Sequence, residues 1–156
     1  MQGLAGYGAH LTTNTGEMIE ETQGSLGERV SVFQAECQAI LHGLDLCENQ
    51  QHTDLKIFVD NQAVLKSLDN PCTTNQSIQM VKDSLNRVGS TKTVTLCWIK
   101  AHICIPDNER ADELAKMGAS HTPLGPGPFV PISRTNIHQA VNKNTGDIWN
   151  NRWKSR

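Results

Sequence analysis

The sequence predicts an α/β fold, a mixed β-sheet flanked by helices in three layers. Its first residues have the pattern of a β-hairpin, and single strands then alternate with helices along the chain. Two short runs, residues 55–60 and 94–99, are apolar enough to be strands buried in a core. Around them, apolar residues recur every three or four positions, which is the spacing of helices that cover a sheet.

The predicted hairpin comprises residues 3–11 and 17–23. Bulky side chains alternate with small ones in the first segment, and Asn14-Thr15-Gly16 is a turn signal. Residues 25–28 are expected to form a loop that leads into the first helix.

The first helix is expected to begin at Ser31. Gln34 follows three residues later, which is the spacing of a capping box. Glu36 lies on or beside the apolar stripe of this helix, and a carboxylate that faces a core needs a partner, a metal ion or a raised pKa. The stripe consists of Val32, Ala35, Ala39, Ile40, Gly43, Leu44 and Cys47.

Two further helices are expected between the two apolar strands. Residues 62–68 predict a short helix. Thr74 or Asn75 is expected to cap a longer one that runs to about Val88. The core candidates of the longer helix are Ile78, Met80, Val81 and Leu85.

The last third of the chain predicts a helix, a strap and a tail. Asp107 or Asn108 would cap the helix, which would end near Gly118. Proline and glycine exclude regular structure from residues 121–133, and a final helix with a break near Gly146 follows. We therefore divide the chain into a domain (1–119), a strap or linker (120–134) and a basic, tryptophan-containing helical tail (135–156).

Length and composition fit one globular domain with a short appendage. The chain has 156 residues, of which 37% are hydrophobic and 19% charged. No run reaches the roughly 18 apolar residues that cross a bilayer, and the first residues lack the features of a signal peptide. We therefore expect an intracellular protein, cytoplasmic and/or nuclear, that is not secreted and has no membrane partner.

The cysteines, the histidines and the net charge restrict the chemistry further. The five cysteines form no metal-binding pair and are expected to be reduced thiols, mostly in the core. Histidines other than His102 are expected to be surface or structural residues. The formal net charge is −2, but residues 134–156 carry five basic residues against one acid, so the rest of the chain is acidic. An acidic body favours divalent metal ions rather than lysines as the groups that meet a phosphate.

Three acids stand where catalysis would be expected. Glu36 lies on a helix, Asp60 ends a strand, and Asp112 lies in the first turns of the last domain helix, after a loop that contains His102. Sites in open α/β sheets form at the carboxyl ends of strands. Hard oxygen ligands select magnesium or manganese, and two such ions about 3.5–4 Å apart can promote phosphodiester hydrolysis. Taken singly, each residue is more often a cap, a solvated acid or a loop histidine.

Three segments in the same order resemble the motifs of the type 1 ribonuclease H family. Residues 33–40 are similar to its glutamate-bearing helix, residues 58–65 to its second aspartate-bearing strand, and residues 98–115 to its closing histidine and aspartate motif. The residues of these motifs are most similar to those of the ribonuclease H domains of non-LTR (LINE-type) retrotransposon polyproteins. A proline-rich strap and a tryptophan-rich basic helix often follow those domains, as residues 128–133 and 149–153 do here.

The resemblance implies a ribonuclease H-like fold and a metal-dependent hydrolysis of the RNA strand of an RNA–DNA hybrid. Glu36, Asp60 and Asp112 would be catalytic metal ligands for two Mg²⁺ ions, with Mn²⁺ as a substitute. His102 would be a catalytic residue that moves protons or helps to release product. Asn61 and Gln62 are expected to contact the substrate because they follow Asp60. The implied partners are the hybrid and a reverse transcriptase domain upstream in a polyprotein.

The chain departs from the family at two points. The family's first aspartate and the central strand that carries it have no counterpart, because the sequence begins at the hairpin. We therefore expect an N-terminally truncated product, inactive or very weak, in which two strands lose a hydrogen-bond partner. The loop formed by residues 101–104 is also more apolar than its family counterpart, which is expected to stiffen His102.

Two rival functions and one rival role for the tail remain open. The domain could be a remnant that binds nucleic acid or protein without catalysis. A DDE-type transposase or integrase shares the fold, but the position of the Glu36 helix and the presence of His102 disfavour it. Trp149 and Trp153, four residues apart, would either dock the tail on the domain, which we favour, or stack on bases.

Overall fold

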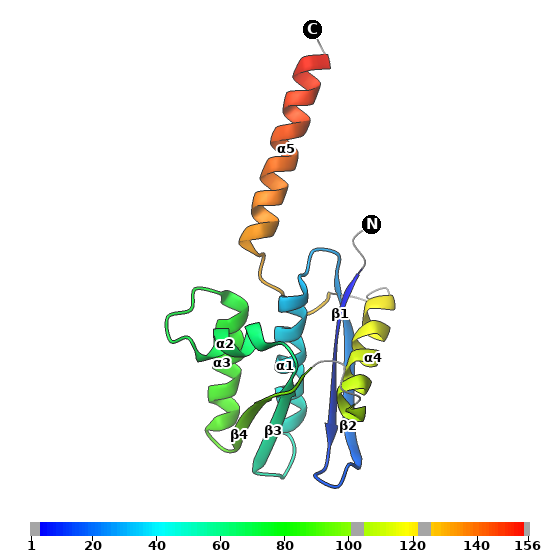
Figure 1. Cartoon of the computed structure of the whole chain (residues 1–156), viewed down its shortest axis with the longest axis vertical. Coiled ribbons are helices and arrows are strands. Elements are labelled where there is room, and N and C mark those ends of the chain that lie inside the picture. The colour runs from blue at the N-terminus through cyan, green and yellow to red at the C-terminus, as the bar shows by residue number, and fades with distance from the viewer. Residues whose placement is uncertain (1–3, 101–104, 122–125, 155–156) are drawn as a thin grey trace.

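The computed structural model describes residues 4–100, 105–121 and 126–154. Its elements follow the predicted order, a hairpin, then helices and single strands, and finally a long helix that extends away from the domain (Figure 1). They are β1 (Ala5–Thr12), β2 (Met18–Gly27), α1 (Val32–Glu48), β3 (Asp54–Val59), α2 (Gln62–Asp69), α3 (Gln76–Gly89), β4 (Thr93–Trp98), α4 (Pro106–Ser120) and α5 (Arg134–Lys154).

The four strands form two sheets rather than the single mixed sheet expected. β1 pairs with β2 in antiparallel fashion, and β3 pairs with β4 in parallel. Within the described residues, β1 has no partner besides β2, and β3 has none besides β4.

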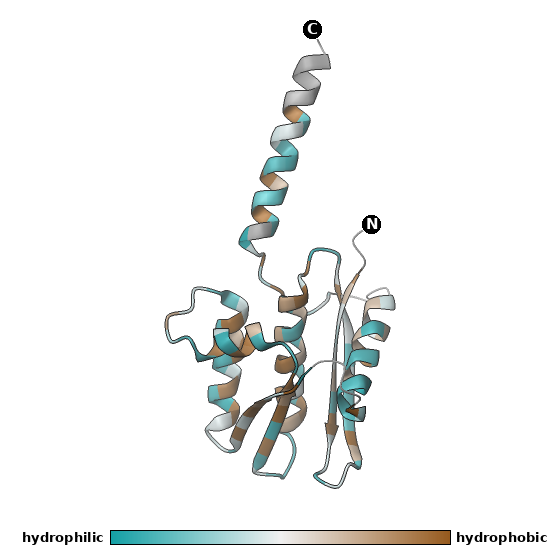
Figure 2. Cartoon of the chain, in the orientation of Figure 1, coloured by the Kyte–Doolittle hydropathy of each residue, from teal (hydrophilic) through white to brown (hydrophobic). Residues whose placement is uncertain are grey.

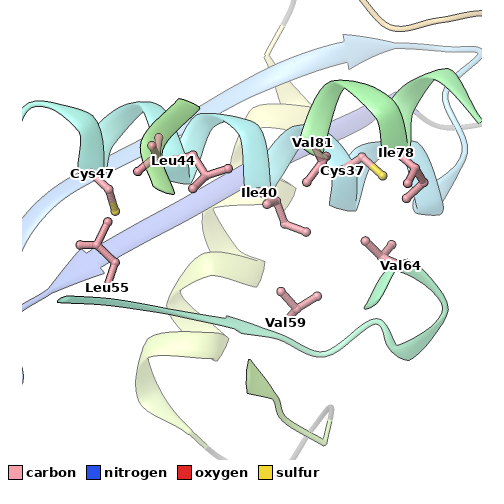
Figure 3. Close-up of a cluster of buried hydrophobic side chains, with 10 residues drawn as sticks. Cys37, Ile40, Leu44, Cys47, Leu55, Val59, Val64, Ile78 and Val81 are labelled. Carbon is pink, nitrogen blue, oxygen red and sulfur yellow. The ribbon is translucent and has the colours of Figure 1, made fainter. Parts of the chain in front are cut away.

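Helix α1 joins the two sheets, because it packs on both β1 and β3. Ser31 caps it, and Ser31 and Gln34 form the predicted capping box. Its buried face includes Ile40 and Leu44, which meet β3 and α3 in the main hydrophobic cluster (Figure 3). Val32, which we assigned to the buried stripe, is 74% exposed. It is the first residue of the helix.

Helices α2 and α3 complete the core on the β3 side. Asn61 and Asn75 cap them, each accepting hydrogen bonds from two backbone amides of the first turn. Ile78 and Val81 are fully buried as predicted, whereas Met80 and Leu85 are half-buried. The core of the domain thus lies between α1, α3 and β3.

Helix α4 packs closely on the β1–β2 hairpin through glycines. A β-carbon at Gly8 would lie 2.5 Å from the carbonyl oxygen of Ala111, and one at Gly6 would lie 2.2 Å from that of Ala115. A β-carbon at Gly118 would lie 2.5 Å from the carbonyl oxygen of Gly24. The glycines of the hairpin therefore allow backbone to approach backbone.

Two predicted boundaries are wrong. α4 begins at Pro106 after Ile105, which makes no side-chain cap, so neither Asp107 nor Asn108 is the cap. Proline at the first helical position is pre-organised for a helix start. β2 continues to Gly27, because pairing with β1 extends through the segment expected to be a loop.

The strap is anchored on α1 by two buried glutamines. Gln34 donates through Nε2 to the carbonyl oxygen of Pro131 at 2.6 Å, and Gln38 donates to that of Phe129 at 3.1 Å. Residues 126–133 have no regular structure, as expected.

Helix α5 follows the strap without a break at Gly146, contrary to expectation. Its described side chains are mostly polar (Figure 2), with Ile137, Val141 and Ile148 more than half exposed. None of the helices in the described ranges combines the length and apolarity that a bilayer span needs.

Candidate active site

The three predicted acids come from three different elements. Glu36 is half-buried in the second turn of α1, Asp60 follows the last residue of β3, and Asp112 lies on α4. The backbone amide of Ile99 donates to the carbonyl oxygen of Val59 at 3.0 Å, which holds the end of β4 beside Asp60. Glu36 thus belongs to the helix that packs on both sheets, whereas Asp60 follows a strand of one sheet and Asp112 lies on the helix that packs on the other.

The pKa of Glu36 shows that these acids influence one another. It is raised from 4.5 to about 7, first by burial, then by the charge of Asp60, and then by that of Asp112. Burial disfavours the ionised form, and negative neighbours do the same. Acids far apart in the sequence are therefore close enough in the fold to repel.

Asp112 already has a cationic partner. Lys116 Nζ lies 2.6 Å from Asp112 Oδ2, one turn further along α4, and both side chains are more than half exposed. This ion pair raises the pKa of Lys116. Asp112 therefore interacts with a lysine of its own helix as well as with Glu36.

The donors present suit a divalent cation by chemistry but do not complete a site for one. Carboxylate oxygens are the ligands that magnesium and manganese prefer. Among residues 4–100, 105–121 and 126–154, however, no group of three or more histidine, cysteine or acidic side chains is arranged to hold an ion.

Asn61 and Gln62, the predicted substrate contacts, both lie at the start of α2. The Asn61 side-chain oxygen accepts from the amides of Ala63 and Val64, so it caps α2. Gln62 is exposed at the start of α2. His102, with the loop expected to be stiff, lies outside the described residues.

A polar network that the sequence analysis missed fixes α4 against the hairpin. Arg110 forms a two-pronged pair with Glu21, with Nε to Oε1 and Nη2 to Oε2 both at 2.8 Å. His10 Nδ1 also lies 2.8 Å from Glu21 Oε1, and its Nε2 lies 3.7 Å from Asp107. The Arg110 hydrogen bond is the main cause that lowers the pKa of Glu21 from 4.5 to about 2. No sequence signal links these residues, because the hairpin and α4 are distant in the chain.

His42 is a structural histidine, as expected. Its ring stacks on that of Tyr7 with centroids 4.0 Å apart and planes 8° from parallel. Burial lowers the pKa of His42. The stack joins α1 to β1 on the face opposite α4.

A shallow groove lies on another side of the domain, between α1, α3 and the strap. His42, Met80 and Phe129 are among its lining residues, together with Arg87, which pairs with Asp45 at 3.1 Å. None of the predicted site residues lines it. The groove is therefore separate from the three acids.

Comparisons with known proteins identify the same fold. The model of the reverse transcriptase-like family matches residues 1–118. RNase H1 of the archaeon Halobacterium salinarum NRC-1 is 22% identical with a TM-score of 0.61, over 74% of this chain and 85% of that one.

Two further solved structures are similar to the chain. The N-terminal RNase H domain of a Mycobacterium tuberculosis protein is 20% identical with a TM-score of 0.64, over 75% of this chain and 83% of that one. LC11-RNase H1 in complex with an RNA/DNA hybrid is 16% identical with a TM-score of 0.62, over 76% of this chain and 87% of that one. No curated protein sequence matches the chain. At these identities, the structural likeness establishes the fold.

Proposed function

The chain belongs to the reverse transcriptase-like family, and from this premise we propose that it is a ribonuclease that hydrolyses the RNA strand of an RNA–DNA hybrid. The observation that supports this best is the electrostatic contact of Glu36 with Asp60 and Asp112. Each acid comes from a separate family-like motif, and the charges of the two aspartates act on the half-buried Glu36. Chance placement of exposed acids would not bury one of them among the charges of the others.

The proposed roles follow from position. Glu36, Asp60 and Asp112 are the proposed metal ligands and catalytic acids, and Mg²⁺, with Mn²⁺ as a substitute, is the proposed cofactor. Bound divalent cations would offset the repulsion that raises the Glu36 pKa. Two ions need donors beyond these three carboxylates, because the described residues form no complete ligand group.

The substrate proposal rests on one similar protein and on the chemistry of RNA. LC11-RNase H1 was solved with an RNA/DNA hybrid, and it shares the fold. A protein distinguishes RNA from DNA through the 2′-hydroxyl, which a wide minor groove displays. Asn61 and Gln62, at the start of α2 beside Asp60, and His102 are the proposed further contacts with the hybrid or its products.

The proposed origin is a LINE-type retrotransposon polyprotein in which a reverse transcriptase domain precedes this one. The order of domain, proline-rich strap and basic helical tail supports that origin. The strap docks on α1 through Gln34 and Gln38, so it is attached to the domain rather than free of it.

A second candidate is a domain that binds hybrid or protein without catalysis. The ion pair between Asp112 and Lys116 favours it, because a lysine then occupies the partner position that a metal ion would take. The incomplete ligand group favours it as well.

Cleavage of a labelled RNA–DNA hybrid with magnesium or manganese tests the proposal. The purified chain is compared with a form extended at its N-terminus by a family-like strand that carries an aspartate. We expect the extended form to cut, and Asp60→Asn to abolish cutting while Asp69→Asn, an exposed acid on α2, does not. If neither form cuts and both fold, the ribonuclease proposal fails and hybrid binding decides the second candidate.

A further inference from the structure

His10 on β1 lies between two carboxylates that come from two other elements. It is the cross-strand partner of Glu21 on β2, and its Nδ1 lies 2.8 Å from Glu21 Oε1. Its Nε2 lies 3.7 Å from Oδ1 of Asp107, in the first turn of α4. The side chain of His10 is 10% exposed, so the ring is largely shielded from water.

The alternation of β1 explains why His10 faces α4, which packs beside the hairpin (Figure 1). Gly6 and Gly8 approach the backbone of α4, and alternate residues of a strand share a face. Tyr7 faces α1 instead, where it stacks on His42. The charged groups that face His10 therefore come from β2 and α4 rather than from α1.

The charges around His10 favour a positive ring. Arg110 of α4 contacts both oxygens of Glu21 at 2.8 Å and also pairs with Glu113 at 3.1 Å. The hydrogen bond from Arg110 is the main cause that lowers the pKa of Glu21 to about 2, so Glu21 stays charged wherever a histidine titrates. With Asp107, the acids outnumber the one arginine, so a proton on His10 reduces the excess of negative charge.

A neutral histidine cannot serve both carboxylates. A neutral imidazole donates through one ring nitrogen and presents a lone pair at the other, whereas the imidazolium donates through both. Nδ1 of His10 is buried and lacks a well-aligned hydrogen bond, although Glu21 lies 2.8 Å away. The attraction between the two is therefore chiefly one of charge. Only the protonated ring attracts Glu21 and Asp107 at the same time.

We propose that His10 is a proton-dependent latch that joins the first turn of α4 to the hairpin. When the ring is protonated, it attracts Glu21 and Asp107 together and holds the start of α4 against β1. When the ring is neutral, its attraction for Asp107 is lost, while Arg110 still pairs α4 with Glu21. The long hydrogen bond from Thr12 Oγ1 to Asp107 Oδ2, at 3.5 Å, does not depend on the proton.

The latch lies outside the candidate active site but on one of its helices. Asp107 is in the first turn of α4, and Asp112 follows it by five residues. The proposal goes beyond the ribonuclease function and does not rest on it, because it concerns how the start of α4 is held. Melting temperatures and NMR measure it in the chain as it stands, so a failure of hybrid cleavage would leave its outcome unaffected.

A double-mutant cycle between His10 and Asp107, measured at pH 5.5 and at pH 8.5, tests the latch. His10→Gln keeps a hydrogen-bonding side chain without a titratable ring, and Asp107→Asn removes only the charge. At pH 5.5, we expect the double variant to melt roughly 1–4 °C higher than the sum of the two single effects predicts. At pH 8.5, we expect the two effects to add. Glu109→Gln, which replaces an exposed acid of the same turn, is the matched control and should not couple to His10.

Three outcomes of the cycle overturn the proposal. Equal coupling at both pH values would show that the neutral ring holds Asp107 as well as the charged ring does. Additive effects at pH 5.5 would show that His10 and Asp107 do not interact. Coupling of the same size between His10 and Glu109 would show a general effect of charge rather than a contact.

The backbone amide of Glu109 provides a second measurement that needs no double variant. Its N–H donates to the carbonyl oxygen of Ile105 at 3.0 Å, at the turn that the latch holds. We expect its NMR chemical shift to change between pH 5.5 and pH 8.5 in the parent chain and to stay constant in His10→Gln. His52→Gln, which replaces an exposed histidine, is the control and should behave as the parent does. A change that persists in His10→Gln would overturn the proposal.

Discussion

Lys116 Nζ lies 2.6 Å from Asp112 Oδ2, so the third acid of the candidate site is already paired with a cation on its own helix. The pair is exposed, and an exposed pair of this spacing contributes little to stability. Its importance is electrostatic, because Asp112 is one of the two charges that raise the pKa of Glu36.

Lys116→Met is expected to raise the pKa of Glu36 above about 7. Without the ammonium group, the charge of Asp112 is no longer offset and disfavours ionised Glu36 more strongly. An NMR pH titration of the Glu36 carboxyl group measures the shift. Lys66→Met, which removes an exposed lysine of α2, is the control. An unchanged Glu36 titration would mean that Asp112 acts on it too weakly to matter.

Glu36→Gln is expected to stabilise the metal-free protein at pH 8 and to leave its stability unchanged at pH 4. Glu36 titrates near 7 when folded and near 4.5 when unfolded. The unfolded state therefore loses its proton first, and stability falls as the pH rises from 4.5 to 7. The free energy of unfolding lost over this pH range is at most roughly 3 kcal/mol. Urea denaturation at the two pH values measures it, with Glu28→Gln as the exposed control.

Arg110→Met is expected to return the pKa of Glu21 from about 2 toward 4.5. A lowered carboxyl pKa contributes stability that is complete above pH 4.5 and lost as the pH falls through 2. The variant should therefore melt at a lower temperature than the parent at pH 7, by a margin that narrows toward pH 2. Glu113→Gln removes only the exposed partner of Arg110 and should shift the melting temperature little. An equal fall in melting temperature in both variants would contradict the claim that the pair of Arg110 with Glu21 stabilises the domain.

Gly8→Ala is expected to destabilise the domain by about 1–3 kcal/mol through overpacking. The new methyl group would lie 2.5 Å from the carbonyl oxygen of Ala111, and backbone cannot move aside as a side chain can. Gly89→Ala, at the end of α3 with open space around it, is the matched control and should be neutral or slightly stabilising. Calorimetry measures the melting temperature of both variants, which should fall for Gly8→Ala only.

Features that depend on neighbouring residues could be predicted from the sequence. The capping box of Ser31 and Gln34 and the Asn75 cap involve side chains and amides within one turn. The acids Glu36 and Asp60 could be placed because each belongs to a short local motif. Asp112 and Lys116, four residues apart on a helix, also had the spacing of an ion pair.

Features that depend on distant segments could not be predicted. The capping role expected of Asp107 was wrong because α4 begins with Pro106, and Asp107 lies beside His10 of the hairpin instead. The pairing of Arg110 with Glu21 joins residues 89 positions apart. The break expected at Gly146 did not occur, because a single exposed glycine costs a helix only about 1 kcal/mol.

Helix α1 sets the distance between the two halves of the domain, because it packs on both β1 and β3. Asp60 follows β3, and Asp112 lies on α4, which packs on the hairpin, so the separation of the two acids depends on how the halves are oriented about α1. A ligand that bound both acids would therefore favour one orientation of the two halves. By linkage, any change that stabilised that orientation would raise the affinity for the ligand by the same factor.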